Sequence, residues 1–298
     1  TNATLLDKEV IQFFNEHDFH VTVSFDGPKE IFDRQRRTKD GSSAYDAAVR
    51  RLPLLLEMLG DRGKVKARAV LANGADPKAV HDEMIRLGFP QYSMGPANAS
   101  PHTAHADPSA GEDLQHKLMA FYQEGVLQFR DALGARDKDR TMRAMQAIEA
   151  PLPTRGDFLE DGLVQIPPVT RACSVGKKAF AVGVNGSLYP CHRFVGLAAY
   201  KSGDIFSKSP FDTLPDRFID QREACRTCWA RYLCGGGCLH LHVTDAGNLD
   251  AVSTRHCEST MQLEKLRIVL WAGMTKDDCA WLNAMGLTEA KSCILDFG

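Results

Sequence analysis

Apolar positions in the first half of the chain alternate between helical and extended spacing. Runs with apolar residues three or four positions apart predict helices, and short runs rich in β-branched residues predict strands. The predicted order is a helix at 7–17, a strand at 20–26, a helix at 43–59, a strand at 66–71, a helix at 77–87 and a strand at 91–94. This strand–helix alternation is typical of a parallel α/β sheet or barrel.

Three strand–helix units are too few to close a barrel, so we expect the start of this domain to lie outside the chain. Residues 112–147 follow with mostly helical spacing. A proline-containing segment at 151–168 then predicts a domain boundary. We therefore expect one domain over 1–150 and a second over 151–298.

The second half opens with a hairpin pattern. Apolar runs at 180–184 and 187–189 flank Asn185-Gly186, a pair that readily takes the positive φ angles of a tight two-residue turn. The hairpin would fold Cys191 back beside Cys173. A helix is predicted near the end of this domain, at about 259–271.

All nine cysteines lie in this second half, and seven of them form one pattern of short and uneven spacings. The seven are Cys173, Cys191, Cys225, Cys228, Cys234, Cys238 and Cys257. Separations of two, three and five residues let a loop aim several sulfurs at one centre, which is typical of metal ligands. The run Gly235-Gly236-Gly237 would let the backbone wrap closely around the metal and bring amides near its sulfurs.

Composition excludes several classes of partner. A net charge of −2 provides no electrostatic attraction to nucleic acid or to an anionic membrane, and no apolar run approaches the length of a membrane span. The chain opens without a signal-peptide pattern, so the sequence predicts a cytoplasmic protein. In that reducing compartment cysteines serve metals more often than disulfides.

The cysteine pattern resembles the SPASM domain of radical S-adenosylmethionine enzymes, which include anaerobic sulfatase maturases. The order Cys-x12-Gly-x4-Cys, gap, Cys-x2-Cys-x5-Cys-x3-Cys, gap, Cys matches at all seven positions. The segments 1–6 and 24–37 also resemble the barrel of that family. The resemblance implies a partial radical S-adenosylmethionine (β/α) barrel followed by a cysteine-rich SPASM domain with a β-hairpin and helices.

The resemblance also implies the cofactors. Two auxiliary [4Fe–4S] clusters would bind in the second domain, one on Cys173, Cys191 and Cys238, and the other on Cys225, Cys228, Cys234 and Cys257. The complete enzyme would add S-adenosylmethionine and a third [4Fe–4S] cluster. Partners would be a peptide or protein substrate and an electron donor such as ferredoxin or flavodoxin.

Two departures from the family pattern change this expectation. The chain has no Cys-x3-Cys-x2-Cys, the motif of the cluster that cleaves S-adenosylmethionine, so the chain alone is expected to be inactive. Ala179 stands where sulfatase maturases supply a fourth thiolate to the first auxiliary cluster. The vacancy would be left open or filled by Cys279, Cys293 or a histidine.

Residues that act on substrate or cofactor are less sharply indicated. His192 directly follows Cys191, where sulfatase maturases have an aspartate that resembles a general base. An imidazole there could accept a proton, although hydrogen bonding to a cluster sulfur or the backbone is the more ordinary role. Ser24 and Asp26 end a predicted strand, where parallel α/β folds place ligand contacts, and Arg36 could meet the carboxylate of S-adenosylmethionine.

The function predicted is therefore an auxiliary-cluster part of a radical S-adenosylmethionine maturase that crosslinks or oxidises a peptide or protein. Two alternatives use the same cysteines. A structural zinc protein also contains Cys-x2-Cys pairs, but seven cysteines divide poorly into four-cysteine zinc sites. An electron-transfer iron–sulfur protein would need no α/β half.

Overall fold

The computed structural model divides the chain into two compact units. The first contains Thr1–Thr154 and Val269–Cys293, and the second contains Arg155–Ile268 and Ile294–Gly298. The described residues are 1–60, 63–72, 74–97, 110–148, 169–170, 173, 175–176, 180–206 and 219–287. Among the described helices, none combines the length and apolarity needed to cross a bilayer.

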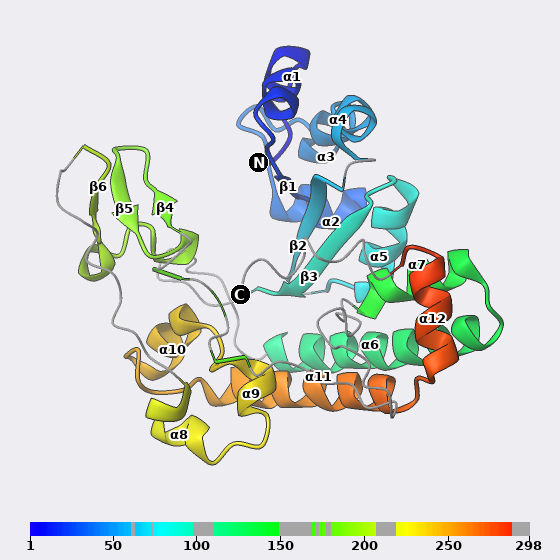
Figure 1. Ribbon diagram of the computed structural model, residues 1–298. Coiled ribbons are helices and arrows are strands. Elements are labelled where there is room, and N and C mark those ends of the chain that lie inside the picture. Colours follow the sequence, from blue (N-terminus) through cyan, green and yellow to red (C-terminus); the bar gives the residue numbers. More distant parts are fainter. Residues whose placement is uncertain are drawn as a thin grey trace. The chain divides into compact units, whose positions relative to one another are not determined.

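The first unit is a parallel α/β structure, as the alternation predicts (Figure 1). Its elements are α1 (Lys8–Glu16), β1 (Val21–Ser24), α2 (Lys29–Gln35), α3 (Ala44–Val49), α4 (Leu52–Leu59), β2 (Val65–Leu71), α5 (Pro77–Arg86), β3 (Gln91–Pro96), α6 (Ala110–Gly134), α7 (Lys138–Ile148) and α12 (Lys276–Ala284). The described strands form one sheet in the order β1-β2-β3, with both neighbouring pairs parallel.

The apolar face of this sheet forms the core. Residues Val65, Ala67, Ala69 and Leu71 of β2 alternate along the strand and are fully buried. Phe25 follows β1 and is also fully buried, with its ring 4.7 Å from Phe32 on α2 and 5.7 Å from Phe89. Helices α4 and α5 pack against β2.

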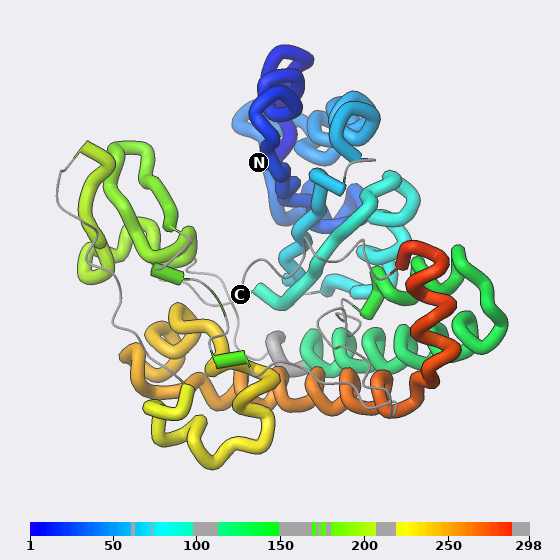
Figure 2. Tube along the Cα trace, viewed as in Figure 1, coloured from blue at the N-terminus to red at the C-terminus, as the bar shows by residue number. Residues whose placement is uncertain are grey.

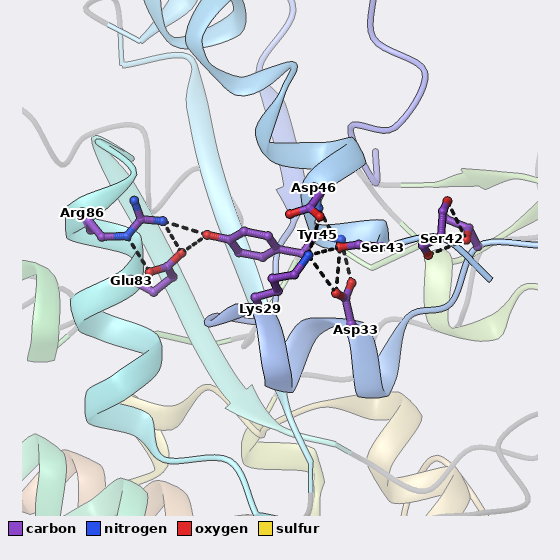
Figure 3. Close-up of polar contacts among 9 residues, drawn as sticks. Lys29, Asp33, Ser42, Ser43, Tyr45, Asp46, Glu83 and Arg86 are labelled. Carbon is purple, nitrogen blue, oxygen red and sulfur yellow. Dashed lines mark hydrogen bonds and ion pairs between the residues drawn. The ribbon is translucent and has the colours of Figure 1, made fainter. Parts of the chain in front are cut away.

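A polar brace joins the helices outside this core (Figure 3). The Tyr45 hydroxyl on α3 donates to Glu83 on α5, and Arg86 Nη2 donates to the same hydroxyl at 2.7 Å. On the other side of the ring, the Tyr45 amide donates to Asp33 Oδ1 of α2 at 2.9 Å. The brace therefore ties α2, α3 and α5, three helices that the sequence pattern did not connect.

The prediction of one continuous helix over 43–59 was wrong. The chain forms two helices there, and the break falls at Arg50 and Arg51. Pro53 lies in the first turn of α4, where its missing N–H is tolerated. Inside one continuous helix the same proline would remove a backbone hydrogen bond and collide with the preceding turn, so the helix restarts before it.

Residues 269–287 pack with the first unit, although we expected all residues after 151 to share one domain. Arg136, which follows α6, reaches Asp278 on α12 with an N–O distance of 2.7 Å. Its guanidinium also lies 5.6 Å from the centre of the Trp281 ring. These contacts join residues more than a hundred positions apart, which local periodicity cannot reveal.

The second unit combines a small antiparallel sheet with short helices. Its elements are β4 (Ala181–Val182), β5 (Ser187–Tyr189), η1 (His192–Phe194), η2 (Ala198–Tyr200), β6 (Gly203–Asp204), η3 (Ile219–Gln221), α8 (Glu223–Arg226), α9 (Arg231–Cys234), α10 (Leu239–Ala246) and the part of α11 (Thr254–Ala272) up to Ile268. The predicted hairpin is present, and β6 adds a third strand beside β5.

Two local details of this unit differ from the sequence prediction. The hairpin turn is not the two-residue type with positive φ at Asn185 and Gly186. Only Gly186 has positive φ, at 82°, and the Gly186 amide bonds the Gly183 carbonyl across a longer turn. In addition, Cys257 lies inside the first turn of α11 rather than before the helix, because the helix already begins at Thr254.

Candidate metal and cofactor site

The cysteines of the second unit interact in a set of three and a set of four. Burial raises the pKa of the Cys173 thiol, and the thiols of Cys238 and Cys191 raise it further. The second set centres on Cys257. Burial raises the pKa of that thiol to about 11, with added contributions from the thiols of Cys234, Cys225 and Cys228. The motif order implies the same two sets as cluster ligands, and that ligation stays a prediction.

The glycine run brings backbone amides to sulfur, as the sequence predicts. Gly235, Gly236 and Gly237 all have positive φ, at 68°, 95° and 72°, which residues with a side chain rarely adopt. The turn points the amides of Gly236 and Gly237 at the Cys234 sulfur, where their hydrogen bonds favour the thiolate. The loop therefore begins at a cysteine of the four-thiol set and ends at Cys238 of the three-thiol set (Figure 2, yellow).

Two buried side chains hold this loop. Arg222 is only 8% exposed, and its Nη1 donates to the Gly236 carbonyl at 2.8 Å. His242 lies 2.8 Å from the same carbonyl through Nε2, while its Nδ1 accepts from the Ser253 amide at 3.0 Å. Because Nδ1 is an acceptor, Nε2 carries the proton and donates to Gly236.

The donor set fits a thiolate-bound metal centre. The described cysteines are free thiols rather than disulfides. Burial raises the pKa of Cys173, Cys191, Cys234 and Cys257, so these thiols need a nearby cation to ionise at neutral pH. Within the described ranges, no three side chains of His, Cys, Asp or Glu are placed so that they could hold one metal ion. Metal binding by these cysteines therefore stays a prediction.

The remaining residues named from the sequence lie in different places. His192 is exposed at the start of η1, one residue after Cys191. Cys279 is buried in α12 of the first unit, away in sequence from the other thiols. Ala179 and Cys293 lie outside the described residues.

In the first unit, Asp26 and Arg36 form an ion pair at the carboxyl end of β1. Arg36 donates to both carboxylate oxygens of Asp26, from Nε at 2.6 Å and from Nη2 at 3.2 Å. The Val70 amide of β2 donates to Asp26 Oδ1 at 3.0 Å. The Asp26 side chain is 2% exposed, so its carboxylate stabilises the strand ends and orients Arg36.

A row of polar side chains crosses the sheet beside this pair. The strand register aligns Ser24 of β1 with Arg68 of β2, and Arg68 with Ser93 of β3. Since aligned residues of parallel strands share a face, all three lie on the face opposite the apolar core. Gly95 makes room for the arginine, because a Cβ at that position would lie 3.0 Å from Arg68 Nη2.

Sequence reasoning selected Ser24 but missed Arg68. No hydrogen bond or ion pair links the Arg68 guanidinium to the described part of the chain. A parallel sheet is ordinarily apolar on both faces, so a half-buried arginine within β2 is a signal that could have been noticed. Ser24, Arg68 and Ser93 together could bind a carboxylate or another small anionic group.

Known proteins are similar to the chain over most of its length. No known protein-family model matches the chain. An uncharacterised protein of Archaeoglobus fulgidus is 31% identical over 253 residues, covering 80% of this chain and 55% of the relative. A cysteine-type anaerobic sulfatase-maturating enzyme of Clostridium novyi is 23% identical over 257 residues, covering 80% of this chain and 62% of the enzyme. The chain thus spans little more than half the length of these two relatives.

A relative matched over a shorter segment and a solved structure are also similar to the chain. A serine-type anaerobic sulfatase-maturating enzyme of Bacteroides thetaiotaomicron is 40% identical over 55 residues, which is 18% of this chain. A structure described as native anSMEcpe with bound AdoMet and Kp18Cys peptide superimposes with a TM-score of 0.61 at 18% identity. That superposition covers 96% of this chain and 74% of the other. The chain therefore has homologues among anaerobic sulfatase-maturating enzymes and shares the fold of the solved structure.

Proposed function

We propose that this chain is the auxiliary-cluster part of a radical S-adenosylmethionine maturase that modifies a peptide or protein. The observation that carries the proposal is the division of seven free thiols into interacting sets of three and four, joined by a loop that directs amides at sulfur. Four thiolates per cluster are the usual ligation of a four-iron centre, and hydrogen bonds to sulfur adjust its potential.

In this proposal the four-thiol set would hold one [4Fe–4S] cluster and the three-thiol set the other. Such clusters, when bound, supply one-electron transfer. The protein's own contribution is to exclude water, hold the sulfurs in position and stabilise negative charge. Burial of the cysteines excludes water. Arg222 and His242 hold the sulfurs in position through the glycine loop. The Gly236 and Gly237 amides stabilise the negative charge on sulfur.

The first unit would bind S-adenosylmethionine along the polar row of the sheet. Arg68 offers a guanidinium for the carboxylate of that molecule, and Ser24 and Ser93 offer hydroxyl groups on the same face. Arg36, held by the buried Asp26 carboxylate, is the second cation near the strand ends. His192 remains a candidate proton acceptor because it is exposed next to Cys191.

Metal analysis of the anaerobically reconstituted chain tests this proposal. Two four-iron clusters correspond to about eight irons and eight acid-labile sulfides per chain. The Cys225→Ser variant should fall to about four of each, because one thiol of the four-thiol set is lost. Cys279→Ser is the matched control, since Cys279 is equally a buried thiol but belongs to the first unit, and it should retain the full content. Stoichiometric zinc without labile sulfide would instead identify a structural zinc protein.

A further inference from the structure

His240 is a buried histidine whose ring has no hydrogen-bond partner. It is the second residue of α10 and only 4% exposed. Neither Nδ1 nor Nε2 has a partner among the described residues. A neutral imidazole has one N–H donor and one acceptor, and leaving both unsatisfied in the interior is costly. Such a side chain indicates that another group occupies the space beside it.

The surroundings of His240 place it beside the three-thiol set. Its ring packs edge-on against Phe194, with the centroids 5.3 Å apart. The Phe194 amide in turn hydrogen-bonds the Cys191 sulfur. Arg193 provides a second link, because its positive charge acts on Cys173, on Cys191 and on His240. His240 also follows Cys238 by two residues. Phe194 therefore links His240 to Cys191, the charge of Arg193 links it to Cys173, and the chain itself links it to Cys238.

Two other histidines near these thiols, His242 and His256, are already engaged. His242 uses both ring nitrogens, one toward Gly236 and one toward Ser253. His256 accepts from the Cys238 amide through Nε2 at 3.3 Å. Among the buried histidines of the described second unit, His240 alone therefore offers two unused nitrogens.

The two cysteine sets differ in their number of thiols. The set around Cys257 has four thiols, whereas the set of Cys173, Cys191 and Cys238 has three. Histidine nitrogen replaces cysteine sulfur at iron in some iron–sulfur centres. We propose that the His240 imidazole is the fourth protein ligand of the cluster held by the three-thiol set. This inference rests on the proposed function, because it assumes that the set binds an iron–sulfur cluster.

Pulsed electron paramagnetic resonance tests the ligand directly. The chain is prepared with either ordinary or ¹⁵N-labelled histidine, reconstituted anaerobically with iron and sulfide, and reduced. Direct ligation should produce a strong nitrogen hyperfine coupling that changes with the label. The coupling should be lost in His240→Cys, which keeps a ligand and should keep the iron content. It should persist in His192→Gln, whose imidazole is exposed beside the same set.

The outcomes separate this inference from the proposed function. Replacement of nitrogen by thiolate should also lower the reduction potential of that cluster, because imidazole ligation raises it. Full iron and sulfide content without histidine coupling in the unsubstituted chain would overturn the role of His240 and leave the proposed function standing. A chain without labile sulfide would overturn both. The measurement on the unsubstituted chain does not depend on whether any variant folds.

Discussion

The buried carboxylate of Asp26 should contribute strongly to the stability of the parallel sheet. Replacing it by alanine leaves the Val70 amide without its acceptor; a fully buried donor would cost about 1–3 kcal/mol, and this partly buried one about 1–2 kcal/mol. It also leaves Arg36 without its counterion. Complete loss of one partner of a fully buried pair costs about 3–5 kcal/mol. Arg36 is 31% exposed and keeps part of its hydration, so we expect a smaller pair contribution of about 1–2 kcal/mol.

The combined effect of Asp26→Ala is therefore about 3 kcal/mol, or roughly a hundredfold in the opening equilibrium. Hydrogen exchange measured on peptides covering residues 65–71 reports this opening locally, without requiring that both units unfold together. Asp26→Asn keeps an oxygen for Val70 and should cost about half as much. Asp82→Ala is the matched control, because its ion pair with Lys78 is more than half exposed and contributes at most about 1 kcal/mol.

Equal exchange rates in Asp26→Ala and Asp82→Ala would refute the argument that this pair stabilises the strand ends. Equal effects of the alanine and asparagine substitutions would refute only the contribution of the Val70 hydrogen bond. The same variants also test how Arg36 is positioned. If Asp26 orients Arg36 for a ligand, Asp26→Asn should weaken binding of S-adenosylmethionine in equilibrium dialysis, whereas Asp82→Ala should leave it unchanged.

Further predictions concern the polar sheet face, the glycine loop, the thiols and the helix brace. Arg68→Gln should weaken S-adenosylmethionine binding by about tenfold or more in equilibrium dialysis, since a charged hydrogen bond is worth about 1.5–3 kcal/mol; unchanged binding would exclude this face as the site. Gly237→Ala should destabilise the second unit by about 1–2 kcal/mol, measured by hydrogen exchange, because alanine resists the left-handed backbone. Cys228→Ala should remove about four irons, and an unaltered iron content would contradict its assignment. Burial raises the pKa of Tyr45 to about 12, so the folded state holds this proton more tightly than the unfolded state. The free energy of unfolding should therefore fall as pH rises from about 10 to 12. Tyr45→Phe should reduce that fall, measured by urea titration at each pH.

The sequence alone determined the local features of both units. Spacing of apolar residues located the strands and most helices of the first unit, although not α2, because helical and extended periods differ within a few residues. The Gly235-Gly236-Gly237 run predicted amides near sulfur because three consecutive glycines adopt positive φ at little cost. The short separations among the cysteines indicated metal chemistry for the same local reason.

Only the tertiary structure decided how distant residues meet. Strand register placed Arg68 between Ser24 and Ser93, and register depends on pairing between separate segments rather than on the pattern within one. Packing joined Arg136 to Asp278 and so brought the late segment to the first unit. The unpartnered ring of His240 likewise became visible only when its neighbours were in place, because hydrogen-bond satisfaction is a property of the assembled interior and cannot be read from the spacing of residues along a chain.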